Sequence, residues 1–223
     1  MRHRILTAVL RWLAIALVLR VLAAILSNYP DYFPPDFDSL FLQGREATFA
    51  GAYRVAFYAH IVSGPFVLVG GLVLLSESVR RRSGRFHRYL GRVQVVALLA
   101  VMLPSGVVMA RHAFGGWPAG VSFVLLSAAT AACSVAGVVT ARRRRFDRHR
   151  RWMLRSFVLI CSAVALRLLS GAASLAEVQS PEVAYVVAAW CSWLVPLVVY
   201  EVTGRRIRAT PGGAPARRAT SPG

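Results

Sequence analysis

The sequence contains no lysine, and carboxylates are scarce: nine acidic residues stand against 27 basic ones in 223 residues. None of the nine lies in the middle of a long apolar run. Proton-coupled transporters commonly place an ionisable carboxylate inside a membrane span, so its absence counts against that class. The absence of lysine, together with much alanine, valine and glycine, is typical of GC-rich bacterial coding and indicates no particular function.

Catalytic motifs are also missing. The three cysteines, Cys133, Cys161 and Cys191, lie inside apolar runs and form no CxxC or CxxCH motif. We expect them to be small buried hydrophobic residues. The sequence has no HExxH motif, no Walker loop and no Ser/His/Asp spacing. Hydrolase and ATPase functions therefore have no support, and the sequence does not decide whether the protein is an enzyme.

Long apolar runs are what the sequence does contain. Apolar residues make up 57% of the chain and charged residues 16%, and a membrane-spanning helix needs about 20 predominantly apolar residues. Suitable runs lie near 7–27, 52–75, 92–112, 119–140, 156–175 and 183–203. We therefore predict an all-α fold, a polytopic membrane bundle of about six helices. Residues 1–204 form a single transmembrane domain, and 205–223 a disordered basic tail.

Arginines gather in alternate loops. They fill 80–92, 142–151 and the stretch after the sixth run, whereas the first long loop, 28–50, is acidic and aromatic. Arginine-rich loops mark the cytoplasmic side, so we predict cytoplasmic N- and C-termini and a multi-pass protein of the bacterial plasma membrane. Contacts with the lipid bilayer and its anionic headgroups account for the net charge of +18, and nucleic-acid binding is not expected.

The first apolar run has the basic start of a signal peptide. It lacks a small-x-small cleavage site before residue 28, and Arg11 and Arg20 interrupt its apolar core. We therefore expect a retained first span rather than a cleaved signal peptide.

Two ionisable residues, His60 and Arg167, are predicted to lie at membrane depth, where such residues are costly and mark candidate functional sites. Helix geometry places Arg167 at the same depth as His60 and on the same face as His149. Arg167 then needs an anion, such as a ligand carboxylate or phosphate. The alternative is that it reaches outward to Glu177 or a headgroup, or binds backbone carbonyls. For His60 the alternative is a neutral histidine bonded to a neighbouring hydroxyl or carbonyl.

Two further histidines, His87 and His149, open the third and fifth spans at the cytoplasmic edge. Two imidazoles at one depth on two helices are the arrangement that holds a b-type haem, with Arg88 and Arg155 as anion partners. The alternative is an interfacial anchor for anionic headgroups, to which Trp152 contributes through the aromatic belt. Apart from such a haem iron, ligated by His87 and His149, no metal site is predicted.

Five stretches carry these residues together with characteristic glycines. They are His60-Ile-x-x-Gly64-Pro65, His87-Arg88-x-Leu90-Gly91-Arg92, Gly106-x-x-Met109-Ala110, Gly115-Gly116, and His149-Arg150-x-Trp152-Met153-x-Arg155-Ser156 running on to Leu166-Arg167-Leu168. Over residues 53–170 the chain resembles the bacterial membrane-protein family known as domain of unknown function 2306. The resemblance implies a polytopic membrane protein and brings no assigned activity. A looser similarity to ferric-reductase-like and ascorbate-dependent cytochromes b rests only on histidines in helices.

Three functions stay open. The first is binding of an anionic or redox small molecule inside the bundle, either a b-type haem or a quinone-like lipid, which would imply a membrane redox partner. The second is a transporter or channel that uses His60 and Arg167, although no inverted repeat is evident. The third is a non-catalytic membrane scaffold or lipid-interacting protein.

Overall fold

The computed structural model describes residues 2–39 and 41–209, which are almost entirely helical. The α-helices are α1 (Arg2–Leu26), α2 (Gly51–Leu75), α3 (Glu77–Arg82), α4 (Gly84–Val96), α5 (Leu103–Ala110), α6 (Gly116–Arg142), α7 (Phe146–Ile160), α8 (Ser162–Leu175) and α9 (Pro181–Ala209). Two short 3-10 turns, η1 (Tyr29–Asp31) and η2 (Glu46–Thr48), lie in the first loop, and a π-helical segment, η3 (Ala97–Met102), joins α4 to α5. No β-strand occurs in these two ranges.

Six helical stretches are long and apolar enough to cross a membrane. They are Trp12–Asp31, Gly51–Leu75, Gly84–Ala110, Gly116–Arg142, Phe146–Leu175 and Pro181–Gly204. The predicted all-α membrane fold with six spans is therefore confirmed. The third and fifth spans begin earlier than predicted, at Gly84 and Phe146, so His87 and His149 lie within helices rather than ahead of them.

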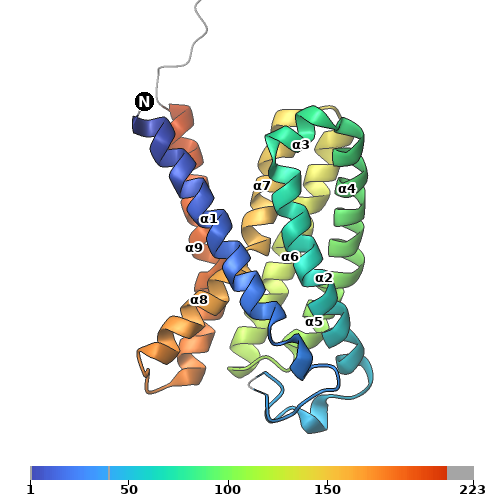
Figure 1. Cartoon of the computed structure of the whole chain (residues 1–223), viewed down its shortest axis with the longest axis vertical. Coiled ribbons are helices and arrows are strands. Elements are labelled where there is room, and N and C mark those ends of the chain that lie inside the picture. The colour runs from blue at the N-terminus through green and yellow to red at the C-terminus, as the bar shows by residue number, and fades with distance from the viewer. Residues whose placement is uncertain (1, 40, 210–223) are drawn as a thin grey trace, which may run out of the picture.

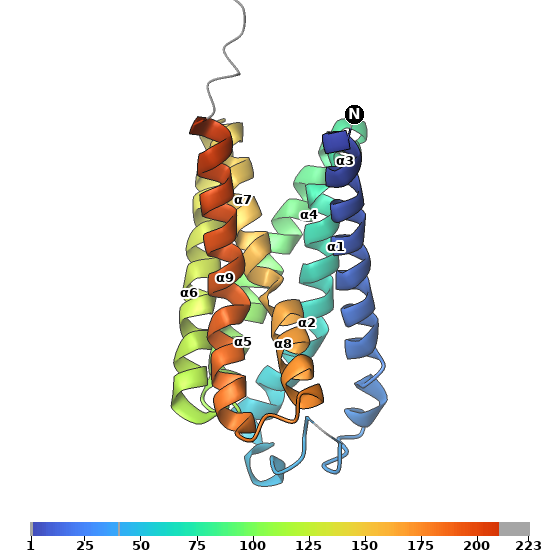
Figure 2. The same cartoon turned by 90° about the vertical axis from the view of Figure 1, so that its left-hand side faces the viewer.

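The chain start, helix α3 and the end of α9 all lie at one end of the bundle (Figures 1 and 2). We call this the arginine-rich end, because residues 80–82 and 142–145 lie there. The opposite end, formed by the loop of residues 27–50, is called the aromatic end. That the arginine-rich end faces the cytoplasm is a prediction from the charge distribution.

The largest buried hydrophobic cluster lies in the middle of the bundle and joins four spans. Its buried members are Val18, Val21, Leu22, Val67, Leu68, Leu98, Ile160 and Val164. Helix α8 lies beside α9 and also contacts α1, and Figure 2 shows it between these two helices. The packing brings residues near the end of α1 close to α8, far apart though they are in sequence.

Buried hydroxyl groups connect the helices that face each other. Ser134 of α6 and Ser156 of α7 share a hydrogen bond of 2.8 Å. The indole N–H of Trp193 in α9 donates to Ser122 of α6 at 3.0 Å, and Ser122 donates to the carbonyl of Ala189 at 3.0 Å. Small hydroxyl side chains allow close helix approach and bond across the interface, as is typical of membrane bundles.

The fifth span is interrupted. Helix α7 ends at Ile160 and α8 begins at Ser162, with a turn at Cys161 between them. The prediction that His149 and Arg167 share one face assumed an uninterrupted helix. Because the two residues lie on separate helices, this prediction no longer has a basis. Figure 1 shows the consequence: α8 leaves the line of α7 and lies with the lower part of α9.

Three spans carry a proline in their interior, away from either end. Pro65 and Pro196 lie inside α2 and α9. Pro104 lies in the first turn of α5, directly after the π-helical segment η3. At the chain end, α9 continues to Ala209, so the first residues of the predicted disordered tail are helical. Residues 210–223, the remainder of that tail, lie outside the described residues.

Candidate functional site

Arg167 lies on α8, in the half of the bundle toward the aromatic end. Its Nη1 donates to the carbonyl of Ala163, one turn earlier on the same helix, at 3.3 Å. Tyr29, Tyr32 and Tyr185 lie within electrostatic reach of its guanidinium group. Within residues 2–39 and 41–209, no carboxylate forms an ion pair with Arg167. Among the described residues, phenolic side chains rather than a paired carboxylate therefore lie within electrostatic reach of this cation.

The guanidinium group is only partly enclosed by protein. Neighbouring residues displace much of the water around the guanidinium group. The side chain nevertheless keeps an exposed surface when the protein is considered without lipid. A guanidinium group has five N–H donors, and only one bond to a protein acceptor is formed. Most of its donors are therefore available to a bound group.

His60 of α2 is held by hydrogen bonds at one ring nitrogen. Its Nδ1 lies 3.1 Å from the carbonyl oxygen of Met102 and 3.3 Å from Oγ of Ser105, and the Ser105 hydroxyl donates to the same carbonyl at 2.9 Å. A carbonyl only accepts, so Nδ1 carries the proton. In the neutral imidazole, Nε2 then presents a lone pair. No described residue bonds Nε2, and Arg167 lies within electrostatic reach of the ring.

The Met102 carbonyl lies where the π-helical segment η3 meets α5. A carbonyl oxygen has two lone pairs, so it can accept from side chains as well as from the backbone. In a membrane bundle, polar side chains such as His60 and Ser105 commonly bond backbone groups in this way. A Cβ at position 106 would lie 3.3 Å from Cε1 of His60, so Gly106 gives the ring its space.

The loop at the aromatic end folds into the bundle. Tyr32 is 8% exposed and belongs to a buried cluster with Leu42, Phe49, Tyr53 and Phe57. The hydroxyl of Tyr58 in α2 donates to the Tyr32 carbonyl at 2.9 Å, and the Tyr29 hydroxyl donates to the carbonyl of Ile61. These two bonds fix the loop against α2, beside His60.

Tyr32 can act as a hydrogen-bond donor to a ligand. Burial raises the pKa of Tyr32, and the positive charge of Arg167 opposes only part of that rise. The side chain is therefore a neutral phenol near neutral pH. We call the following residues the Arg167 cluster: His60, Arg167, Tyr29, Tyr32 and Tyr185.

A second cation, Arg45, lies close to this cluster. Its Nη1 donates to the Tyr53 hydroxyl at 3.1 Å and to the carbonyl of His112 at 2.7 Å. It also lies within electrostatic reach of Tyr185. Arg45 thus ties the loop to the end of α5 and adds positive charge at the same end of the bundle.

The other two predicted histidines come together at the arginine-rich end. Nδ1 of His149 in α7 donates to the carbonyl of Gly137 in α6 at 2.8 Å, which leaves Nε2 as the acceptor in a neutral ring. Nδ1 of His87 in α4 is buried and has no hydrogen-bond partner. His149, Arg80 and Arg88 all lie within electrostatic reach of His87. We call His87 and His149 the histidine pair.

Arg155 and Trp152, also singled out from the sequence, pack against each other elsewhere. Arg155 donates from Nε and Nη2 to the two carboxylate oxygens of Glu201 in α9, the second bond measuring 3.0 Å. Its guanidinium carbon lies 4.7 Å from the centre of the Trp152 ring and 5.9 Å from that of Tyr200. The charge of Arg155 is therefore neutralised by Glu201, in contrast to that of Arg167.

Residues 57–203 match the family described as "Predicted membrane protein (DUF2306)". The chain belongs to this family. The protein is therefore a multi-pass membrane protein in contact with the lipid bilayer. No curated protein and no solved structure matches the chain.

The DUF2306 match extends further than the resemblance recognised in the sequence. It runs past residue 170 to residue 203 and so includes most of α9, which carries Tyr185 and Glu201. Neither Tyr185 nor Arg45 was predicted as a site residue, and the same is true of Tyr32. No spacing in the sequence relates these residues to Arg167, because each comes from a different segment of the chain.

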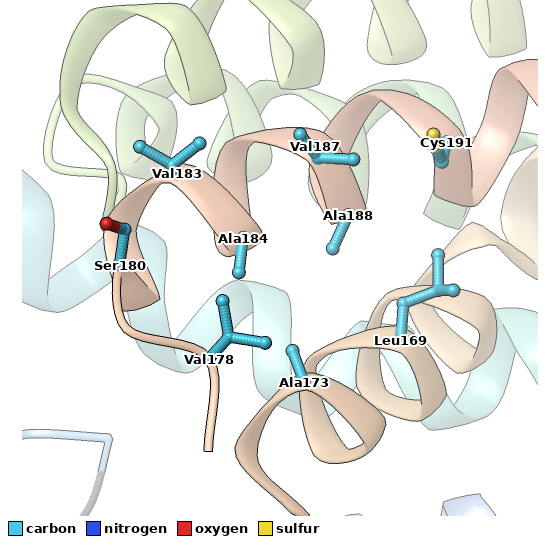
Figure 3. A pocket seen from close by; sticks show the side chains of 9 residues that line it. All are labelled: Leu169, Ala173, Val178, Ser180, Val183, Ala184, Val187, Ala188 and Cys191. Carbon is cyan, nitrogen blue, oxygen red and sulfur yellow. The ribbon is translucent and has the colours of Figure 1, made fainter. Parts of the chain in front are cut away.

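An apolar groove lies between α8 and α9, on the surface of the bundle (Figure 3). It is lined by Leu169, Ala173, Val178, Ser180, Val183, Ala184, Val187, Ala188 and Cys191. This lining is almost wholly apolar and includes the exposed side chains of Val183 and Val187. It suits an acyl chain of the surrounding lipid rather than a charged group.

Proposed function

We propose that this DUF2306 protein binds a small molecule or lipid headgroup with an anionic group at the Arg167 cluster. The observation that supports the proposal most directly is the environment of Arg167. It is a cation in a membrane span, and within the described parts of the chain it has no carboxylate partner. Three tyrosines and His60 lie within electrostatic reach of it. An anion bound at Arg167 would meet the guanidinium donors, with the protonated Tyr32 nearby.

The energetic argument concerns the cost of the charge. An arginine at the centre of a membrane helix costs about 2.5–3.5 kcal/mol on insertion scales. Its bond to the Ala163 carbonyl satisfies one donor but does not neutralise the charge. A bound anion would supply both a counter-charge and acceptors, and hydrogen bonds between charged groups contribute about 1.5–3 kcal/mol each. Ligand binding therefore offsets the free-energy cost of the Arg167 charge in the membrane, which the described protein groups do not offset.

Replacing Arg167 with glutamine is expected to weaken anion binding about tenfold to hundredfold, because it removes the charge and keeps an amide of similar shape. The probes are oleate, dioleoylphosphatidic acid and dioleoylphosphatidylmethanol. Binding is measured by native mass spectrometry of the full chain in detergent. Arg20→Gln is the matched control, since Arg20 also lies in a membrane span. If no probe binds, or if Arg167→Gln binds them all as tightly as the wild type, the proposal fails.

A second candidate function has its own observations at the histidine pair. His149 is oriented by the Gly137 carbonyl, as haem-ligating and metal-ligating histidines commonly are. His87 has a buried ring nitrogen with no protein partner. We infer that a b-type haem binds between them, with the two imidazole rings as its axial ligands. Arg88 is the remaining candidate for a propionate partner, because Arg155 is paired with Glu201.

A haem-loaded preparation is expected to show a sharp reduced α-band in the b-type region, and His149→Ala should abolish it. The measurement is a reduced-minus-oxidised visible spectrum of protein expressed with haem supplied. His112→Ala is the control, since His112 lies at the opposite end of the bundle and should leave the band unchanged. A flat wild-type spectrum at a concentration where stoichiometric haem is visible would exclude this candidate.

A further inference from the structure

The structure of the Arg167 cluster points to a class of ligand. We propose that its occupant is a phosphate monoester that retains one proton, such as the headgroup of phosphatidic acid. This inference rests on the function proposed above and narrows it. It follows from two requirements that different residues impose on the same bound group.

The first requirement is charge. Within the described residues, Arg167 donates one hydrogen bond, to a backbone carbonyl, and three tyrosines lie within electrostatic reach of its charge. A ligand with at least one negative charge neutralises it, and oxygen acceptors match the geometry of a guanidinium group. A neutral quinone supplies acceptors but no counter-charge, so it meets this requirement only in part.

The second requirement is a hydrogen-bond donor on the ligand. His60 donates from Nδ1 to the Met102 carbonyl, an acceptor that forces the proton onto that nitrogen. The ring in its neutral form adds no second positive charge beside Arg167, and its Nε2 then carries a lone pair. No residue within the described ranges donates to Nε2. A ligand that bonds this nitrogen of the neutral ring must bring its own proton.

A singly protonated phosphate monoester meets both requirements within one group. A carboxylate and a phosphate diester without a hydroxyl are anions, but they only accept hydrogen bonds. Their oxygens would face the lone pair of His60 without a proton between them. A phosphate monoester loses its second proton with a pKa of about 6, so a singly protonated anion is available near neutral pH. A nonpolar surrounding favours this form over the doubly charged one.

The tyrosines of the cluster fit the same ligand. The hydroxyls of Tyr32 and Tyr185 bond no residue of the described chain, so they can donate to the remaining phosphate oxygens. The Tyr29 hydroxyl already donates to the Ile61 carbonyl and offers only its lone pairs. The cluster thus combines donors from Arg167, Tyr32 and Tyr185 with the acceptor on His60.

The decisive comparison uses two lipids that differ in one group. Dioleoylphosphatidic acid and dioleoylphosphatidylmethanol have the same acyl chains, and the methyl ester removes the acidic P–OH. We expect the wild type to bind phosphatidic acid about tenfold more tightly near pH 6, the contribution of one charge-assisted hydrogen bond. The measurement is titration of the full chain in detergent, followed by native mass spectrometry.

His60→Asn tests the role of the imidazole. The asparagine amide can still donate to the Met102 carbonyl from about the position of Nδ1, but it places no acceptor where Nε2 lies. The tenfold preference should fall to near one, while binding of both lipids should still depend on Arg167. A His60→Asn protein that keeps the full preference would overturn the inference.

A readout on the wild type covers the case in which His60→Asn does not fold. Raising the pH from about 6 to about 8 removes the phosphate proton, so the preference for phosphatidic acid should fall. The titratable and charged groups near the ligand are His60, Arg167, Arg45, Tyr29, Tyr32 and Tyr185. Phosphatidylmethanol has no phosphate proton to lose in this range, so the pH dependence of its binding measures any change in these groups. A preference that stays constant across this range would contradict the inference.

The remaining outcomes separate this inference from the function on which it rests. Equal binding of the two lipids by the wild type, lost in Arg167→Gln, overturns the monoester and leaves anion binding intact. Binding that does not depend on Arg167 overturns both. Glycerol 3-phosphate is the soluble probe: if it displaces phosphatidic acid, a free monoester is the source, and if it does not, the source is the lipid. Both results support the phosphate monoester class.

Discussion

Replacing Arg155 with methionine is expected to destabilise the protein by about 2–3 kcal/mol. Removing one partner of a fully buried ion pair costs about 3–5 kcal/mol, and the Arg155 and Glu201 side chains are 20% and 29% exposed, so a smaller effect is appropriate. Methionine keeps much of the apolar packing on the Trp152 ring, so the loss reports mainly on the ion pair. The free energy of unfolding is measured by titration with a denaturing detergent, followed by circular dichroism.

The double variant Arg155→Met/Glu201→Met isolates the interaction between the two charges. We expect it to be more stable than Arg155→Met alone, because no carboxylate then stays in the bundle without its guanidinium group. Arg81→Met is the control, since the Arg81–Glu77 pair is exposed and should contribute no measurable stability. If Arg155→Met and Arg81→Met have the same effect, the Arg155–Glu201 pair does not hold α7 to α9.

Replacing Gly120 with alanine is expected to destabilise the contact between α5 and α6 by about 1–3 kcal/mol. A Cβ at position 120 would lie 2.5 Å from the carbonyl oxygen of Ala110. This oxygen belongs to the backbone of α5, so no side-chain rotation can move it away, and the helices must separate. Alanine favours a helix over glycine by about 1 kcal/mol, which offsets only part of the loss. Thermal unfolding in detergent measures the change.

Gly64→Ala is a matched control for Gly120→Ala. Gly64 is also in the interior of a membrane helix, but a Cβ there would have no atom within 4 Å. We expect Gly64→Ala to leave stability unchanged or to raise it slightly through helix propensity. Equal destabilisation by both substitutions would show that the loss of glycine itself, and not the close approach of α6 to α5, causes the effect.

Local composition was sufficient to predict the spans and the ionisable residues within them. Whether a run of about 20 residues is apolar depends on those residues alone, so the six spans and the isolated positions of His60 and Arg167 could be read directly. The closeness of His60 to Arg167 and of His87 to His149 was expected from depth estimates. The structure brings each pair within electrostatic reach, and their roles stay predictions.

The break at Cys161 and the partners of each cation could not be read in the same way. A helix interruption depends on how the flanking turns pack against other helices, and nothing in the residues around Cys161 requires one. The same holds for the cations. Arg155 and Arg167 look alike as arginines in the fifth span, yet one meets Glu201 and the other meets tyrosines.

The sequence by itself therefore determined that this is a helical membrane protein with six spans, with arginines at one end and two ionisable residues at depth. The reason is that transfer of a segment into the bilayer is set by its own side chains. Only the tertiary structure decided which cation is neutralised, which ring nitrogen of His60 carries the proton, and which tyrosines surround Arg167. These depend on contacts between residues that are distant in the chain, and such contacts exist only once the helices have packed.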